Sequence, residues 1–123
     1  RPSIPTVDAI PLERDPLTEA AAGADLIVNA TSVGMSRGEA EGRSPLDSDL
    51  IPSGILVYDM VYTPGETPLM RQARNAGAQA LGGLWMLIYQ GAASFQLWTG
   101  RQAPIEVMYA AGERALATQF PDR

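Results

Sequence analysis

The chain has 123 residues, and its 14 Asp and Glu residues outnumber its nine basic residues, which gives a net charge of −5. This length fits one small domain or part of a larger protein, and an acidic surface repels phosphate backbones, so we expect no nucleic-acid binding. All nine basic residues are Arg, and the sequence contains no Cys, His or Lys, which excludes thiolate chemistry, a Ser-His-Asp triad and a catalytic lysine in this chain and leaves no expected metal site.

The first elements are indicated by turn residues and apolar spacing. Loose alternation in residues 6–12 predicts a short strand. A short helix is expected next, because Asp15 can cap its first turn and Gly23 can stop its last one. The apolar run 25–29 predicts a buried strand whose exit is rich in turn residues.

The middle of the chain alternates between polar loops and regular elements. Residues 36–44 are polar and contain glycines, which predicts a surface loop, and residues 45–50 predict one helical turn. A second buried strand is expected over residues 55–59. Thr67 is a good N-cap and is followed by proline, so a helix is expected from there to about Asn75.

The rest of the chain predicts a short strand followed by two helices. Residues 78–81 are the expected strand, residues 82–98 a long apolar helix and residues 104–119 a final amphipathic helix. The long helix contains polar residues and glycines, so we interpret it as a buried helix rather than a membrane span. The whole pattern is typical of an α/β fold built on a parallel sheet.

Polar residues follow two of the predicted strands, in segments 29–35 and 59–66. Ligands of parallel sheets bind beyond the carboxyl ends of the strands, so these segments form a candidate binding edge. The sequence contains no G-x-G-x-x-G and no Walker motif, so a dinucleotide would need a pyrophosphate turn from outside this chain. Residues 1–5 lack the pattern of a signal peptide, and we expect a soluble cytoplasmic protein cut from something longer.

Three segments, in this order, resemble one family. They are Asn29-Ala-Thr-Ser-Val-Gly-Met35, then Tyr58-Asp-Met-Val-Tyr-Thr-Pro-Gly-Glu-Thr67, then a stretch that begins Gly83-Leu-Trp-Met-Leu-Ile-Tyr-Gln90 and ends at Gly100. Together they resemble the C-terminal half of shikimate dehydrogenase, an NADP-dependent oxidoreductase of aromatic amino-acid biosynthesis, in the chorismate pathway.

The resemblance implies a partial Rossmann-like parallel sheet with flanking helices that lacks the Gly-rich first half. Residues 1–82 would be the rear half of the NADP-binding domain. Residues 83–123 would be the C-terminal helices that pack between the cofactor and substrate domains. The family's catalytic Lys and Asp lie in the N-terminal half, so the resemblance implies no catalytic residue in this chain and a missing half that supplies them.

The implied reaction is hydride transfer between NADP and the pair shikimate and 3-dehydroshikimate. Two alternatives remain open. The chain could be a stand-alone, non-catalytic binding or interaction module derived from this fold, which fits the absence of Lys, His and a phosphate turn. It could also be part of a quinate-accepting relative, because the residues that choose between the two acids lie largely upstream.

By this resemblance, four residues bind the cofactor. Thr31 and Ser32 would lie beside its nicotinamide side, Met60 would contact the nicotinamide ring, and Gly83 would hold the carboxamide. Each residue also has a purely structural interpretation. These are a Ser/Thr turn that satisfies its own backbone, a methionine of the core, and a flexible join before a helix.

By the same resemblance, Tyr62 and Gln90 bind the substrate. Gln90 also stands out without the family, because a Gln buried in an apolar helix without partners would cost roughly 1–3 kcal/mol. We therefore expect a polar group to meet it, either on shikimate or on a neighbouring backbone. Tyr62 could instead pack at the sheet edge with its hydroxyl in water. Asn29 and Asp59 are interpreted as residues that support the loops.

Overall fold

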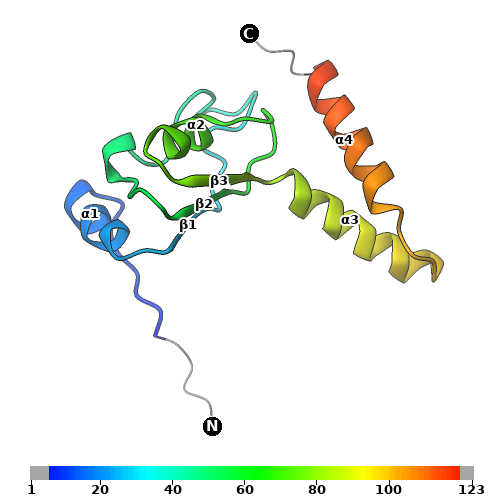
Figure 1. Ribbon diagram of the computed structural model, residues 1–123, viewed down its shortest axis with the longest axis horizontal. Helices are drawn as coiled ribbons and strands as arrows, with labels where there is room; N and C mark the ends of the chain where they lie inside the picture. The colour runs from blue at the N-terminus through cyan, green and yellow to red at the C-terminus, as the bar shows by residue number, and fades with distance from the viewer. Residues whose placement is uncertain (1–5, 120–123) are drawn as a thin grey trace.

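Three parallel strands form a sheet in the order β1-β2-β3, and the chain then leaves the sheet as a helical hairpin (Figure 1). This computed structural model describes residues 6–119; residues 1–5, on which the signal-peptide expectation rests, and residues 120–123 lie outside the described part. The elements are α1 (Arg14–Ala22), β1 (Leu26–Asn29), the 3-10 turn η1 (Ser48–Leu50), β2 (Leu56–Asp59), α2 (Pro68–Asn75), β3 (Gln79–Gly82), α3 (Leu84–Thr99) and α4 (Ile105–Gln119). The predicted parallel α/β arrangement is confirmed.

The hydrophobic core lies between α2 and one face of the sheet. Val57 in β2 and Ala73 in α2 have no exposed surface, and Leu69 is almost fully buried. Ile51 and Ala78 complete this cluster. β2 is the central strand, paired on both sides. Its predicted burial is confirmed for Val57 and Asp59, whereas Leu56 and Tyr58 are half-buried.

β1 is less buried than its apolar sequence predicts. Leu26 and Val28 are about half exposed, whereas Asn29 at the end of the strand is buried. Within residues 6–119, β1 pairs only with β2 and is therefore an edge strand. The prediction of a buried strand over residues 25–29 is right about the strand and wrong about the burial of one face.

The strand predicted for residues 6–12 does not form. These residues are exposed and have no regular structure. A segment of alternating apolar and polar residues forms a strand only where a neighbouring strand can pair with it. None of the described strands pairs with residues 6–12. The helix that follows begins at Arg14, so Asp15 lies inside its first turn instead of capping it.

The local signals for α2 are confirmed. The Thr67 hydroxyl caps the helix by accepting a hydrogen bond from the Met70 amide at 3.2 Å, and Pro68 occupies the first turn. The turn after the helix needs Gly77, whose φ of 81° is in the left-handed region. The chain then returns directly into β3, where Ala80 pairs with Val57 of β2.

α3 and α4 form a hairpin whose helices approach closely at glycines. A Cβ at Gly112 would lie 3.0 Å from Leu84 Cδ1, and a Cβ at Gly91 would lie 3.2 Å from Met108 Cε. Gly100 ends α3 with a φ of 68°, as predicted. Figure 1 shows this hairpin extending away from the sheet.

α3 is not the buried helix that its composition predicts. Its buried residues are Ile88 and Ala92, whereas Leu97 and Trp98 are each 84% exposed. The described residues cover little of α3 beyond the side that meets α4, so apolar composition alone overestimated the burial of this helix. Within residues 6–119, no helix is both long enough and apolar enough to cross a membrane.

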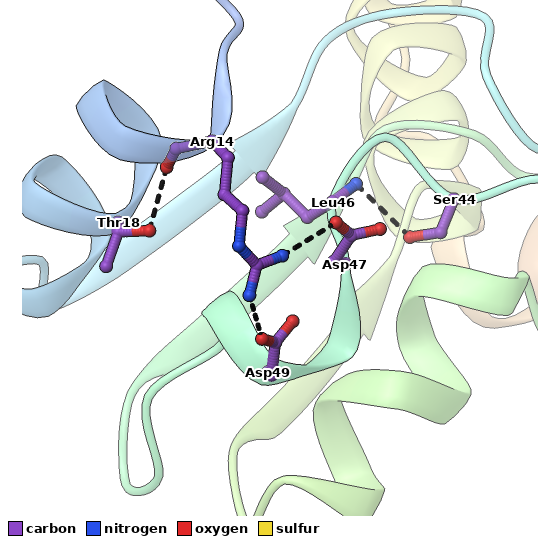
Figure 2. A network of polar contacts seen from close by, with 6 residues as sticks. All are labelled: Arg14, Thr18, Ser44, Leu46, Asp47 and Asp49. Carbon is purple, nitrogen blue, oxygen red and sulfur yellow. Dashed lines mark hydrogen bonds and ion pairs between the residues drawn. The ribbon is translucent and has the colours of Figure 1, made fainter.

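A surface ion-pair cluster joins α1 to the turn that precedes β2 (Figure 2). The Arg14 guanidinium lies 3.2 Å from the Asp47 carboxylate and also contacts the Asp49 carboxylate. The hydrogen bond from Arg14 is the main reason why the pKa of Asp49 is lowered below its ordinary value. All three side chains are well exposed, so water and salt screen the cluster and its contribution to stability is small.

We expect Asp49→Asn to lower the melting temperature slightly at neutral pH, because it removes the charge that Arg14 holds. A lowered folded-state pKa stabilises the protein above the ordinary Asp pKa of about 3.9, and this stabilisation is lost as the pH falls through the folded-state value. The difference between wild type and variant should therefore shrink on acidification. Thermal unfolding from neutral to acidic pH measures this, with Asp8→Asn as a control that removes an exposed carboxylate without an ion pair among residues 6–119. A difference that grows on acidification would contradict the assignment.

Candidate functional site

The ends of the three strands are held together at one edge of the sheet. The last residues of the strands, Asn29, Asp59 and Gly82, are paired across the sheet in register. Beyond them, the Met60 amide donates to the Asn29 carbonyl at 3.0 Å, and the Gly83 amide donates to the Val61 carbonyl at 3.3 Å. The predicted binding edge thus consists of the three segments that follow the strands, which we call the strand exits, and backbone hydrogen bonds join them to one another.

The exit of β1 is a turn organised by Asn29. The Asn29 Oδ1 atom accepts from the Thr31 amide at 3.0 Å and from the Thr31 hydroxyl at 2.7 Å. The Thr31 hydroxyl in turn accepts from the Val33 amide at 3.1 Å. Thr31 therefore uses its hydroxyl mainly inside the turn, as the Ser/Thr-turn interpretation describes. The Ser32 side chain is exposed and makes no hydrogen bond within the described residues.

The exit of β2 is organised by Asp59, whose side chain is fully buried. One oxygen accepts from the Asn29 side-chain amide at 2.9 Å and from the Val61 amide at 3.0 Å. The other oxygen accepts from the Thr67 hydroxyl at 2.6 Å. Loss of such a partner leaves a buried group unsatisfied, which costs about 1–3 kcal/mol. Asp59 supports the loop, in agreement with the sequence interpretation.

Gly83 is required by a close approach of two backbones. The residue is buried, and a Cβ placed on it would lie 2.2 Å from the Met60 carbonyl oxygen. Its φ of −75° suits any residue, so space is the only constraint on this position. The sequence offered a ligand contact or a flexible join as explanations; the structure adds a third, which is that the half-buried Met60 passes directly over Gly83.

A cavity of about 400 Å³ lies next to these exits. Tyr62 and Gly83 are the two predicted site residues that line it, and α2 and α4 contribute Arg74, Tyr109 and Glu113. The Tyr109 ring stacks on Trp85 with ring centroids 3.9 Å apart. Burial, followed by the neighbouring Glu113, raises the pKa of Tyr109. This contribution from α4 was not predicted from the sequence.

The structure does not bring all the predicted site residues to this cavity. Thr31, Ser32, Met60 and Gln90 do not line it. Gln90 is exposed, which contradicts the argument that its amide must be buried and met by a polar group. By helical spacing it shares a face with Leu97, and that face is not the one packed on α4. The amide is exposed because the described residues cover α3 mainly on the side that meets α4.

The residues that sequence reasoning undervalued are the ones that join the two exit loops. Asn29 and Asp59 were assigned to loop support without a link between them, and Thr67 was assigned only a capping role. The sequence contained one signal of this link, because Asn29 and Asp59 are polar residues that each end an apolar strand. Parallel pairing with the strand ends in register places them side by side. Among residues 6–119, no group of three or more acidic residues is arranged to hold a metal ion.

The comparisons with known proteins agree with this geometry. A family model described as the shikimate 5'-dehydrogenase C-terminal domain matches residues 83–111. The shikimate dehydrogenase (NADP(+)) of Halorubrum lacusprofundi is 48% identical over 97 residues, which is 79% of this chain and 34% of that protein. The chain matches the C-terminal part of shikimate dehydrogenases. It spans about a third of the length of this relative.

Solved shikimate dehydrogenase structures share the fold. The enzyme of Thermus thermophilus, crystallised with NADP(H) and shikimate, superposes with a TM-score of 0.73 at 42% identity and covers 82% of this chain and 37% of the other. A quinate dehydrogenase from Corynebacterium glutamicum, in complex with NAD, gives a TM-score of 0.71 at 33% identity, with 81% of this chain and 34% of that chain covered. The predicted class, a partial Rossmann-like parallel sheet with flanking helices, is confirmed.

We expect Gly83→Ala to destabilise the protein and displace the β2 exit, because the new Cβ meets a backbone carbonyl that no rotamer change can move. Overpacking of this kind costs about 1–3 kcal/mol or more. Chemical denaturation measures the loss. Gly23→Ala is the matched control, since a Cβ there has open space. Equal stability of the two variants would contradict the close approach described for Gly83.

Proposed function

We propose that this chain forms part of the NADP and shikimate sites of an oxidoreductase that transfers a hydride between NADP and the pair shikimate and 3-dehydroshikimate. The observation that carries the proposal is the convergence of three strand exits at one edge of the sheet. Its support is the similarity to the Thermus thermophilus enzyme, which was crystallised with NADP(H) and shikimate. The reaction belongs to aromatic amino-acid biosynthesis.

The residues at the exits of β1 and β2 fit the nicotinamide end of the cofactor. Ser32 offers an exposed hydroxyl that no described residue uses, and half-buried Met60 offers a thioether that packs well on a flat ring. Thr31 contributes to cofactor binding mainly by stabilising the turn that presents Ser32. Gly83 contributes mainly by leaving space for the backbone of Met60. When bound, NADP supplies the carbon that gives or takes the hydride; the protein aligns the reacting groups.

Tyr62 and Gln90 are the proposed substrate-binding residues. Tyr62 is partly exposed on the loop after β2, and its hydroxyl makes no hydrogen bond within the described residues. Gln90 is exposed on α3, seven residues after Gly83, which is about 10 Å along the helix axis. Its side-chain amide has no partner among the described residues and can bind a substrate hydroxyl or carboxylate.

Proton transfer is proposed to depend on residues outside this chain. This chain has neither Lys nor His, so the catalytic Lys and Asp are proposed to come from a part outside it. Residues 1–82 are proposed to be the rear part of the cofactor domain, and residues 83–123 the helices between the cofactor and substrate domains. The family model begins its match at residue 83, which supports this boundary.

A quinate and NAD preference is the second candidate. Its support is the similarity to the Corynebacterium glutamicum quinate dehydrogenase in complex with NAD. We expect the full-length protein to reduce NADP when shikimate is present. This reaction should be faster than the reduction of NAD with quinate. Cofactor absorbance measures all four combinations of cofactor and acid. Faster turnover with quinate and NAD would select the second candidate, and no turnover with any pair would favour the non-catalytic module.

The isolated chain of 123 residues should show no shikimate-dependent NADP reduction, because it has no Lys to transfer the proton. The same absorbance assay measures this at several pH values, with the full-length protein as the positive control. Turnover by the isolated chain would contradict the assignment of proton transfer to residues outside it.

In the full-length protein, Gln90→Ala should raise the KM for shikimate by about tenfold, as expected for loss of one hydrogen bond to the substrate, and leave the KM for NADP nearly unchanged. Steady-state kinetics with each substrate varied in turn measures this. Gln96→Ala is the control, because Gln96 is an exposed Gln on another face of the same helix. Equal effects on both KM values would rule out the substrate role.

A further inference from the structure

The buried carboxylate of Asp59 is held by hydrogen bonds alone. Within residues 6–119, no Arg forms an ion pair with it, and its three hydrogen-bond partners are all donors. The donors come from three places in the chain. Asn29 ends β1, Val61 lies on the loop after β2, and Thr67 caps α2. One side chain therefore connects two strand exits and a helix start.

The network extends from Asp59 into both exit loops. On one side, Asn29 also bonds Thr31 and, through its side-chain amide, the Val33 carbonyl at 3.3 Å. On the other side, the Thr67 hydroxyl donates to Asp59 and accepts from the Met70 amide. Fully satisfied buried networks of this kind rigidify the segments that they join.

The proposed cofactor residues lie between two ties that join the exits. The inner tie is the Asn29–Asp59 hydrogen bond, together with the bond from the Met60 amide to the Asn29 carbonyl. The outer tie is the hydrogen bond from the Ser36 amide to the Thr63 carbonyl at 2.6 Å. Residues 31–32 and 60–62 are enclosed between these ties, so a change at the inner tie alters their relative position directly.

We propose that Asp59 is a positioning residue, whose bond to Asn29 fixes the loop of Thr31 and Ser32 against the loop of Met60 and Tyr62 and so preorganises the nicotinamide end of the cofactor site. This inference rests on the proposed function. Asp59 acts through Asn29 and makes no contact with the ligand itself. Its bond to Thr67 serves a different purpose, which is the stability of α2.

The hydrogen bonds from Asn29 and from Thr67 to Asp59 can be removed one at a time by substitution in the full-length protein. Asn29→Ala removes the bond to Asp59, the bonds to Thr31 and the bond to the Val33 carbonyl. Thr67→Val is the matched control, because it removes the other bond to Asp59 and leaves the Asn29 side intact. Asn29→Ser is a milder second variant: its hydroxyl can still accept from the Thr31 amide, but it lacks the side-chain amide that donates to Asp59 and to Val33.

The first readout is the dissociation constant of NADP, measured by calorimetry on folded protein. Asn29→Ala and Asn29→Ser should raise it by about tenfold, because a loop that holds its binding position about a tenth of the time binds about ten times more weakly, with kcat at saturating NADP much less affected. Thr67→Val should lower the melting temperature but leave the dissociation constant close to that of wild type. Asp59→Asn should also bind almost normally, because its amide oxygen can still accept from Asn29 and Val61, whereas Asp59→Ala should not.

The second readout needs no ligand. Hydrogen–deuterium exchange at residues 30–33 should be faster in Asn29→Ser than in Thr67→Val, because the Asn29 side-chain amide that donates to Asp59 and to Val33 is lost only in the first. Asp59→Ala, which keeps the bond to Val33 and loses only the tie, should also exchange faster than Thr67→Val. Equal exchange and equal dissociation constants in these two variants would overturn the positioning role. Wild-type protein that binds no NADP would instead overturn the proposed function, and the exchange data would then still report whether the tie orders the loop.

Discussion

A single buried carboxylate joins the ends of two strands to the start of a helix. Asp59 ends the central strand, and its two oxygens bind the end of β1, the loop after β2 and the start of α2. A buried carboxylate is stable only when its hydrogen-bonding capacity is used. The positions of the two loops at the binding edge therefore depend on one another, and neither can shift without leaving a buried polar group unsatisfied.

The passage from the sheet to the helical hairpin depends on a second constraint. Gly83 lies directly against the Met60 carbonyl, so the start of α3 and the exit of β2 occupy their positions together. The Gly83 amide reinforces this contact by donating to Val61. Because the proposed cofactor and substrate residues lie on both sides of this contact, the geometry of the site is set by backbone atoms more than by the ligand-facing side chains.

The two packing regions of the chain differ in how they are built. The sheet and α2 share a core of aliphatic side chains around Val57, whereas α3 and α4 meet at glycines and an aromatic stack between Trp85 and Tyr109. Glycine contacts bring helices close but bury little apolar surface. α3 has the most apolar composition of the helices, yet it leaves Leu97 and Trp98 exposed, and Leu97 lies on a face that α4 does not cover.

The sequence by itself determined the features that depend on near neighbours in the chain. The Thr67 cap, the end of α3 at Gly100 and the parallel strands at residues 55–59 and 78–81 are confirmed, because capping, chain reversal and short apolar runs act locally. Only the tertiary structure decided which apolar faces are covered, and it is there that the expected strand at residues 6–12 and the expected burial of Gln90 are wrong. It also decided why Gly83 is glycine and what Asp59 joins, since both answers depend on atoms more than twenty residues away in the chain.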